Sequence, residues 1–404
     1  MCATLTGLRH ITDPFRRRAP SQPRRILVIK LAEQGAWVVA WSALMDAVEL
    51  VGRDNVFVMT FSENRFVLDQ LDVVVPDNII EVRASGPLIT AVDLIRAVRR
   101  ARAERIDASV DLEFFARSSA ILGFLSGASR RVGFHRSAKE ASYRGNLLTH
   151  RLSFNQRLHV GETFRLLVAA LGENPRSLPA VEPHDLTAEA PPVIATTATE
   201  RSEIRSIVAS RTGSGDPAAL VVLNANAGDL LPLRKWPEER YVELARQLLD
   251  RYDKLTVVFT GAPAEAAAAN HLAAQVGSKR AVSLGGATTM RQLLVLYSLA
   301  EVLVTNDSGP AHYAALTPID IVTLFGPESP RVFGSLSPRN HAMWAELPCS
   351  PCVNAYNDRI SSCRDNKCMQ RLSVDRVFDA VCNTLDARTR AGTIVPSDEP
   401  TSPP

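Results

Sequence analysis

Short apolar runs of strand length alternate with helical segments twice along the chain, and this pattern restricts the fold more than any other feature. In the first half, runs at 26–29, 56–60 and 108–110 are separated by helical stretches at 38–50 and 88–104. The second half continues in the same way, with strands at 220–223, 256–259, 281–284, 302–305 and 321–325 and helices at 238–251, 265–276 and 290–300. Strands that alternate with helices form parallel sheets. We therefore expect an α/β protein of two doubly wound domains, with a ligand cleft at the carboxyl ends of the strands.

The length of 404 residues also favours two domains, each with its own hydrophobic core. Both ends lack an apolar period and predict disordered tails, and a segment rich in Pro, Thr, Ala and Ser predicts a linker around a helix at 199–210. The expected order is a basic tail at 1–23, a first domain at 24–185, a linker at 186–216, a second domain at 217–372, a C-terminal helix at 373–388 and a tail at 389–404.

Charge is divided unevenly along the chain, although the net charge is only +3. Up to Ala180 there are 25 basic and 18 acidic residues, against 21 and 25 after it, so the first half is basic and the second acidic. A basic half suits an anionic substrate, a membrane surface or nucleic acid, or is simply a solvated surface. Only 6% of the residues are aromatic and none is interleaved with the arginines, which disfavours nucleic acid. Without an apolar run long enough to span a membrane or to act as a signal peptide, the sequence predicts a cytoplasmic protein.

The segment 302–316 has the pattern of a strand-to-helix turn that binds phosphate. An apolar strand ends at Asn306 and is followed by four residues typical of a helix start. Asp307 or Ser308 can cap the helix, Gly309 lets a ligand approach the backbone, and Pro310 suits the first helical turn. Backbone N–H groups at such a helix start attract anions. The alternative is a well-capped helix without a ligand.

A second candidate site lies in 224–237, where a strand runs into Asn-Ala-Asn-Ala-Gly and two cations, Arg234 and Lys235, precede a helix. Such cations can hold a diphosphate and compensate the charge that it gains on leaving. The alternative is an ordinary basic surface with Trp236 in the core. Glu265, after the strand at 256–259, could accept hydrogen bonds from ribose hydroxyls, or could simply lie in the first turn of a helix.

Together these motifs resemble glycosyltransferase family 9, the heptosyltransferase-like enzymes of bacterial cell-surface polysaccharide synthesis. The resemblance covers most of 25–385 and runs through ILVIKLAEQGAWVVAWSAL, RVGF, LNANAGDLLPLRKWPEERYVELA, FTGAPAE, VTNDSGPAHYAAL, TLFGPESP and the segment from Cys349. It implies a GT-B fold of two Rossmann-like domains that face a central cleft. It also implies a nucleotide-sugar donor on the second domain, an acceptor on the first, and inverting transfer that needs no metal or other cofactor.

By position in these motifs, the resemblance places the donor on residues of the second domain: Asn226, Arg234, Lys235, Glu265, Asp307, Ser308, Gly309 and His312. The family usually has a lysine where this chain has Arg234, an exchange that keeps the charge and adds bidentate geometry. The resemblance favours an ADP-linked donor and heptose as the sugar. The acceptor would be a saccharide or lipid-linked saccharide, with the basic half facing an anionic glycolipid at the inner membrane surface.

The first loop departs from the family, whose usual Gly-Asp supplies the general base, because this chain has Gly35-Ala36 there. We expect Glu33, on the same loop, to take the proton of the acceptor hydroxyl, with a pKa raised by desolvation. The alternative is that Glu33 only caps a helix or pairs with Lys30. In that case the chain would be a non-catalytic sugar-nucleotide-binding or scaffold protein.

Three other residues of the first half are candidates for contacts with the acceptor. Asp111 and Glu113 follow the strand at 108–110 and offer carboxylates for sugar hydroxyls. His159 stands at the start of a helical stretch, where a structural histidine is the alternative.

Four of the six cysteines cluster as Cys349, Cys352, Cys363 and Cys368 in a polar loop. Cysteines at this spacing predict a structural zinc or iron–sulfur site. A disulfide or redox-sensitive pair, and thiols packed in a loop, are the alternatives.

Overall fold

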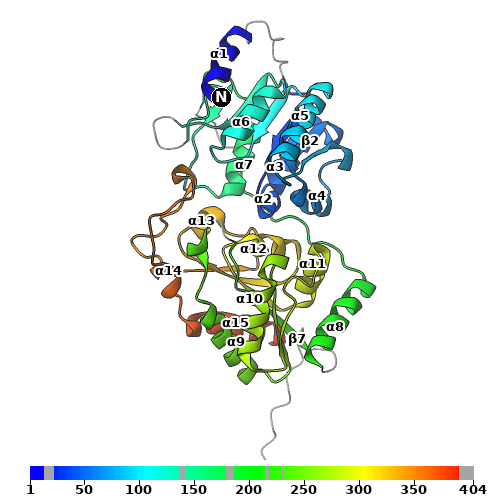
Figure 1. The fold of residues 1–404 in the computed structure, drawn as a ribbon, viewed down its shortest axis with the longest axis vertical. Coiled ribbons are helices and arrows are strands. Elements are labelled where there is room, and N and C mark those ends of the chain that lie inside the picture. Colours follow the sequence, from blue (N-terminus) through cyan, green and yellow to red (C-terminus); the bar gives the residue numbers. More distant parts are fainter. Residues whose placement is uncertain (13–21, 137–141, 179–185, 214–217, 229–230, 391–404) are drawn as a thin grey trace, which may run out of the picture. The chain divides into compact units, whose positions relative to one another are not determined.

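The computed structural model describes residues 1–12, 22–136, 142–178, 186–213, 218–228 and 231–390 (Figure 1). The chain divides into two compact units. Unit 1 consists of Met1–Pro191, Arg331–Phe333 and Val353–Ser361, and unit 2 consists of Pro192–Pro330, Gly334–Cys352 and Ser362–Pro404. Each unit contains its own six-stranded sheet, so the predicted α/β class with two doubly wound units is confirmed.

The sheet of unit 1 is parallel throughout, with the strand order β3-β2-β1-β4-β5-β6. Its strands are β1 (Ile26–Ile29), β2 (Val56–Phe61), β3 (Ile79–Val82), β4 (Ala108–Asp111), β5 (Arg130–Phe134) and β6 (His150–Leu152). The chain builds outward from β1 on one side and then continues from β4 on the other. The loops after β1 and β4 therefore diverge at the point where ligands enter doubly wound sheets.

The helices of unit 1 are α1 (Cys2–Thr12), α2 (Gln34–Val39), α3 (Trp41–Val51), α4 (Arg65–Leu71), α5 (Pro87–Ala103), α6 (Arg117–Leu125) and α7 (Val160–Ala169). Most of these helices connect one strand of this sheet with the next, while α1 precedes β1 and α7 follows β6 (Figure 1). In one core cluster, side chains of β1 and β2 such as Leu27 and Phe57 pack with Ala97 and Ala101 of α5. Small residues on that face of α5 let the helix approach the sheet closely.

The sheet of unit 2 repeats this arrangement, with the order β12-β11-β10-β7-β8-β9 and parallel pairing throughout. Its strands are β7 (Ala219–Asn224), β8 (Leu255–Phe259), β9 (Ala281–Ser283), β10 (Val302–Asn306), β11 (Asp320–Phe325) and β12 (Asn340–Trp344). Here the strand order reverses between β7 and β10. The loops after these two strands carry both phosphate-binding motifs predicted from the sequence.

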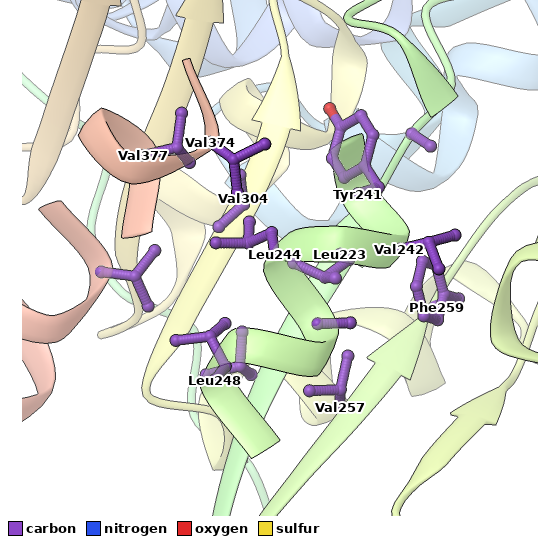
Figure 2. Packing of buried hydrophobic residues seen from close by; sticks show 14 of the residues in the cluster. Leu223, Tyr241, Val242, Leu244, Leu248, Val257, Phe259, Val304, Val374 and Val377 are labelled. Atoms are coloured by element: carbon purple, nitrogen blue, oxygen red, sulfur yellow. The ribbon is translucent and has the colours of Figure 1, made fainter. Parts of the chain in front are cut away.

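The helices of unit 2 are α8 (Ala198–Thr212), α9 (Glu238–Arg251), α10 (Ala266–Val276), α11 (Met290–Leu299), α12 (Gly309–Tyr313), α14 (Lys367–Gln370) and α15 (Val374–Arg390). Of α13 (Pro330–Phe333), Pro330 belongs to unit 2 and the other residues to unit 1. Figure 2 shows Leu244 and Leu248 of α9 among strand residues such as Val257 and Val304. All four side chains are fully buried. Leucines four residues apart lie on one face of a helix, so α9 covers the sheet with a continuous apolar stripe.

The N-terminal segment corrects the prediction of a disordered tail at 1–23, because α1 covers Cys2–Thr12. Cys2 joins a buried cluster with Ile121 and Phe124 of α6. The hydroxyl of Thr6 accepts a hydrogen bond from the backbone N–H of Asn146 at 2.8 Å. This helix depends on contacts distant in sequence, which a local apolar period does not reveal. Residues 13–21 of the predicted tail lie outside the described residues.

The predicted linker at 186–216 is also corrected, because its helix is longer and belongs to the fold of unit 2. Thr197 and Glu200 form a capping box at the start of α8, and Glu200 pairs with Arg291 of α11 at 2.8 Å. Ile204 and Val208 are buried. At the other end of the chain, α15 reaches Arg390, two residues beyond the predicted helix.

We predicted that the whole cysteine-rich loop, residues 349–368, belongs to the second domain. This prediction is wrong for residues 353–361. Val353–Ser361 makes its contacts with unit 1, whereas the flanking residues belong to unit 2. The sequence between Cys352 and Cys363 offers no apolar period that would indicate this division. Among the helices that the structure describes, none has the length and apolar character needed to cross a membrane.

Candidate functional site

A buried ion pair links the two loops that diverge at the centre of the sheet in unit 1. Lys30 directly follows β1 and is 1% exposed, and its Nζ contacts Oε2 of Glu113, which follows β4, at 2.9 Å. The other carboxylate oxygen of Glu113 accepts hydrogen bonds from the backbone N–H groups of Leu31 at 2.7 Å and Ala32 at 3.1 Å. Glu113 therefore fixes the shape of the first loop.

Glu33 lies at the end of this loop, immediately before α2, with a φ of 69°. Its side chain makes no capping hydrogen bond to α2. Instead, one oxygen accepts from Nζ of Lys30 at 3.4 Å, and the other is paired with the guanidinium of Arg359. The alternative that Glu33 caps a helix is therefore wrong, whereas pairing with Lys30 is observed.

These two cations reverse the pKa shift predicted for Glu33. Burial alone raises the pKa of this carboxyl, but the attraction of Lys30 and Arg359 outweighs burial and lowers the pKa to about 2. The side chain is 38% exposed, so solvent weakens both attractions. Glu33 is thus a carboxylate at neutral pH and can accept a proton, but Arg359 covers one of its oxygens.

Arg359 was not indicated by any sequence pattern, since it is 326 residues from Glu33 along the chain. A short turn positions it: Asn354 accepts hydrogen bonds from the N–H groups of Tyr356 at 2.9 Å and Asn357 at 3.3 Å. The ring of Tyr356 lies 5.3 Å from that of Phe115, between centroids. Arg359 itself has a φ of 57°, in the left-handed region. Packing of this segment against unit 1 therefore brings the guanidinium to Glu33.

Asp111 and His159, predicted to contact an acceptor, are both engaged within unit 1. Asp111 is 2% exposed and pairs with the buried Arg144. Burial raises the pKa of Asp111, and the attraction of Arg144 opposes this rise. Nδ1 of His159 accepts a hydrogen bond from the N–H of Gly161 at 3.1 Å and caps α7. We assign Asp111 to the core and His159 to the helix cap, as the structural alternative for His159 anticipated.

In unit 2, Asn306 makes the hydrogen bonds that hold the loops together where the strand order reverses, between β7 and β10. It is fully buried at the end of β10, and its Nδ2 donates to the carbonyl oxygens of Ala225 at 2.9 Å and Asn226 at 3.2 Å. Its Oδ1 accepts from the N–H of Trp236 at 3.0 Å and from the hydroxyl of Tyr241 at 3.1 Å. One amide therefore holds both ends of the loop after β7 against the end of β10.

The turn after Asn306 has the predicted strand-to-helix form, but α12 is only one turn of helix followed by a 3-10 turn at Ala314–Leu316. Ser308 precedes α12 without capping it, and its hydroxyl donates to the carbonyl oxygen of Asn306 at 3.2 Å. Asp307 is 3% exposed, and His312 lies in the last turn. A Cβ at Gly309 would lie 3.1 Å from the hydroxyl of Tyr313, so a side chain here would require the ring of Tyr313 to shift.

Arg234, on the loop after β7, has a largely buried side chain that is 12% exposed. Its Nη1 lies 3.4 Å from Oε2 of Glu328, which is fully buried, and its Nη2 donates to the carbonyl oxygen of Ala227 at 3.3 Å. Lys235 is held through its backbone, since its carbonyl oxygen accepts from Nδ2 of Asn366 at 2.9 Å. Glu328 lies within the FGPES segment and was not predicted as a site residue. It orients Arg234.

Asn226 and Glu265 converge on Gly261, which follows β8. A Cβ at Gly261 would lie 2.8 Å from Nδ2 of Asn226 and 3.1 Å from Cβ of Glu265. The carboxylate of Glu265 accepts a hydrogen bond from the N–H of Ala262 at 2.8 Å and so closes the first turn of a 3-10 helix, Pro263–Glu265. The structure thus brings these two predicted donor ligands together, although Glu265 also serves the local turn.

The cysteines remain without an assigned role. Cys349 and Cys363 are exposed, Cys352 is partly buried and Cys368 is buried. Burial raises the pKa of the Cys368 thiol, and Cys352 and Cys363 add to this rise. Within the described part of the chain, no group of three or more His, Cys, Asp or Glu side chains is arranged to hold a metal ion. The zinc or iron–sulfur site stays a prediction.

The model of glycosyltransferase family 9 (heptosyltransferase) matches residues 94–360. This chain belongs to glycosyltransferase family 9. The match includes Glu113, Arg359 and every predicted donor ligand, whereas Glu33 precedes it. The departure from the usual Gly-Asp therefore lies in a part of the chain that the family match does not cover.

Relatives in family 9 share a limited part of the sequence. Lipopolysaccharide heptosyltransferase 2 of Salmonella typhimurium is 35% identical over 102 residues, which is 24% of this chain and 29% of that protein. Lipopolysaccharide heptosyltransferase 1 of Pseudomonas aeruginosa is 31% identical over 140 residues, 34% of this chain and 38% of that protein. The sequence matches thus span well under half of these relatives.

Solved structures show that the likeness in fold extends over nearly the whole chain. Escherichia coli ADP-heptose lipopolysaccharide heptosyltransferase II aligns with 90% of this chain and 99% of its own, at a TM-score of 0.67 and 20% identity. A family 9 glycosyl transferase from Veillonella parvula aligns with 91% of this chain and 98% of its own, at a TM-score of 0.68 and 19% identity. The GT-B architecture implied by the resemblance is confirmed.

Proposed function

We propose that this family 9 protein transfers a sugar from a nucleoside-diphosphate donor to a hydroxyl of a saccharide or lipid-linked saccharide. One observation carries the proposal: Asn306 ties the loop after β7 to the end of β10. The Arg234 loop and the turn at 307–312 therefore meet at the reversal of strand order in unit 2, where doubly wound sheets bind nucleotides.

The donor is held through its diphosphate in this proposal. Arg234 and Lys235 compensate the negative charge on the leaving diphosphate, and Glu328 keeps the guanidinium of Arg234 in place. Asn226 and Glu265 supply polar groups for the ribose or the sugar. An ADP-linked heptose is the donor we favour, because relatives and structural neighbours are named as heptosyltransferases and one of the latter was solved with ADP.

Transfer then proceeds by direct displacement with inversion, without a metal. The acceptor hydroxyl gives its proton to the carboxylate of Glu33, and its oxygen attacks the anomeric carbon. The bond from that carbon to the diphosphate oxygen breaks, and the nucleoside diphosphate leaves with the electron pair. Removal of the proton by a positioned carboxylate is worth about 10²- to 10⁴-fold in rate.

Glu33 meets the acceptor only when Arg359 is displaced from one of its oxygens. An anionic group on the acceptor could take over the guanidinium, since a phosphate or carboxylate is the preferred partner of arginine. Loss of this ion pair raises the pKa of Glu33 and makes it a stronger base. Binding of an anionic acceptor would thus free Glu33 from Arg359 and make it a stronger base.

A non-catalytic sugar-nucleotide-binding protein is the second candidate, and Ala36 favours it because alanine cannot accept a proton. Ala36 lies in the first turn of α2, and its N–H donates to the carbonyl oxygen of Glu33 at 3.0 Å. We place the protein, in either role, in the cytoplasm and at the anionic inner face of a membrane.

The test combines ligand binding with turnover. Thermal unfolding with ADP, UDP and GDP identifies the nucleotide, because a ligand that binds only the folded state raises the unfolding temperature. Release of nucleoside diphosphate from the matching donor, with and without acceptor, then measures turnover. Acceptor-dependent release supports the enzyme, whereas binding without release supports the non-catalytic protein.

A further inference from the structure

Helix α5 of unit 1 carries an uncovered apolar stripe. The stripe consists of large aliphatic residues three or four positions apart, which lie on one side of a helix: Leu88 is 82% exposed, Val92 46% and Ile95 53%, with Ile89 beside them at 41%. The opposite side of α5 packs on the sheet through Ala97 and Ala101. Leu94 and Val98 also pack partly against this core cluster, whereas the four aliphatic residues of the stripe remain exposed on the other side of the helix.

The C-terminal half of the same helix is strongly basic. Arg96, Arg99, Arg100 and Arg102 are all exposed. Helical spacing places Arg99 and Arg102 on the continuation of the stripe, whereas Arg96 and Arg100 lie on another side of the helix with Asp93. The only acidic residue of α5, Asp93, is buried and paired with Arg83 at 2.7 Å and Arg96 at 3.3 Å.

A hollow opens on another side of α5, between the helix and β3, and arginines of α5 and of the segment after β3 line it. Its volume is about 400 Å³, and Arg83, Arg96 and Arg100 contribute to its walls together with Glu81 and Asp93. Glu81 is paired with Arg65 at 2.9 Å, so the carboxylates around the hollow are largely neutralised by their own partners. The hollow therefore adds to the basic character of this part of unit 1.

We propose that α5 is the surface by which this protein binds an anionic phospholipid membrane. Leu88, Val92 and Ile95 enter the boundary between headgroups and acyl chains, while Arg99 and Arg102 contact lipid phosphates. Apolar residues beside arginines on one helix face are typical of helices that lie in the membrane interface, and each basic residue near an anionic leaflet strengthens binding. These features favour a lipid surface over a protein partner.

This inference rests on the membrane location given under the proposed function and names the surface responsible, but it does not depend on which sugar is transferred. The test is co-sedimentation of the full-length protein with vesicles of phosphatidylcholine alone, or of phosphatidylcholine and phosphatidylglycerol in equal amounts, at low and high ionic strength. Because no sugar nucleotide is present, the result is independent of whether the protein transfers sugar. We expect binding to the anionic vesicles that weakens as salt is added.

Two double variants separate the apolar from the basic contribution. Leu88→Ser with Ile95→Ser should reduce partition onto anionic vesicles about tenfold or more, because burial of these side chains is lost. Arg99→Gln with Arg102→Gln should reduce it by a similar factor and weaken its salt dependence. The matched controls lie in unit 2: Val193→Ser, at a valine that is 56% exposed, and Arg371→Gln with Arg376→Gln, at two exposed arginines. These controls should bind like the wild type.

Several results would overturn the proposal. One is absence of wild-type binding to anionic vesicles, and another is equal binding by the wild type and both α5 variants. Self-association in the absence of lipid that the Leu88→Ser and Ile95→Ser changes abolish, measured by sedimentation velocity, would assign α5 to a second copy of the chain instead. The substituted side chains are exposed, and thermal unfolding of each variant verifies that folding is intact.

Discussion

Arg359 covers one carboxylate oxygen of Glu33 while Lys30 contacts the other, so the residue that we propose as the base is held between two cations. The two cations differ in burial, because the side chain of Lys30 is 1% exposed and that of Arg359 19%. Lys30 is fully buried and is fixed by Glu113, whereas Arg359 belongs to a short turn that reaches Glu33 from the far end of the sequence. Arg359 is therefore the cation that can leave.

Replacing Arg359 by alanine should raise the pKa of Glu33 from about 2 toward the ordinary carboxyl value of 4.5. A lowered pKa stabilises the fold above pH 4.5, and this stability is lost as the pH falls toward 2. Arg359→Ala should remove part of it, an effect that the partial exposure of Glu33 keeps small. Carboxyl-carbon NMR titration measures the pKa of Glu33. The pH below which the rate of transfer falls should rise together with this pKa. Arg359→Lys keeps the charge and serves as the control; an unchanged Glu33 pKa in Arg359→Ala would contradict the assignment.

Replacing Lys30 by methionine should destabilise unit 1 by on the order of 3 kcal/mol, because Glu113 then lacks its buried partner. Chemical denaturation measures this loss. The double variant Lys30→Met with Glu113→Gln should recover much of it, since the amide oxygen can still accept from Leu31 and Ala32. If the double variant is as unstable as the single one, the pair does not fix the loop.

Replacing Arg144 by methionine should cost on the order of 3 to 5 kcal/mol of folding free energy, since it leaves the buried carboxyl of Asp111 without its partner. Asp111→Asn should lower stability but leave the Michaelis constant for the acceptor unchanged in protein that remains folded. A raised Michaelis constant for the acceptor at unchanged stability would instead show that Asp111 contacts the acceptor.

Replacing Arg234 by alanine should weaken binding of the nucleoside diphosphate about 10- to 100-fold, the effect of losing a hydrogen bond between charged groups. Arg234→Lys should lose less, because it keeps the charge without the bidentate geometry. Isothermal titration with ADP measures both constants. Arg371→Gln, at an exposed arginine of unit 2, is the control. Equal affinities in the wild type and Arg234→Ala would remove Arg234 from the donor site.

The sequence was sufficient to predict the two parallel sheets, because buried parallel strands such as β1 and β10 appear as short apolar runs between amphipathic helices. Shorter or less apolar strands, such as β6 and β12, were not predicted, because three residues or a polar sequence give little pattern. The helix α1 was missed for a related reason: packing on α6 stabilises it, and this contact is not local in sequence.

The site was predictable where its residues follow strands directly, as Asp307 and Glu113 do. Roles that depend on distant partners were not predictable. The sign of the pKa shift of Glu33 follows from Arg359, and Asp111 was assigned to the core because Arg144 neutralises it. Charged residues acquire their function from neighbours in space, which a single sequence does not give.

The most direct test of the account is transfer by Glu33→Gln, compared with the wild type under saturating donor and acceptor. Glutamine keeps the size of the side chain but cannot take a proton at neutral pH. We predict that the rate of transfer falls about 10²- to 10⁴-fold, while the affinity for the nucleoside diphosphate, which binds unit 2, stays unchanged. Near-normal turnover by folded Glu33→Gln would contradict the central claim that Glu33 is the base.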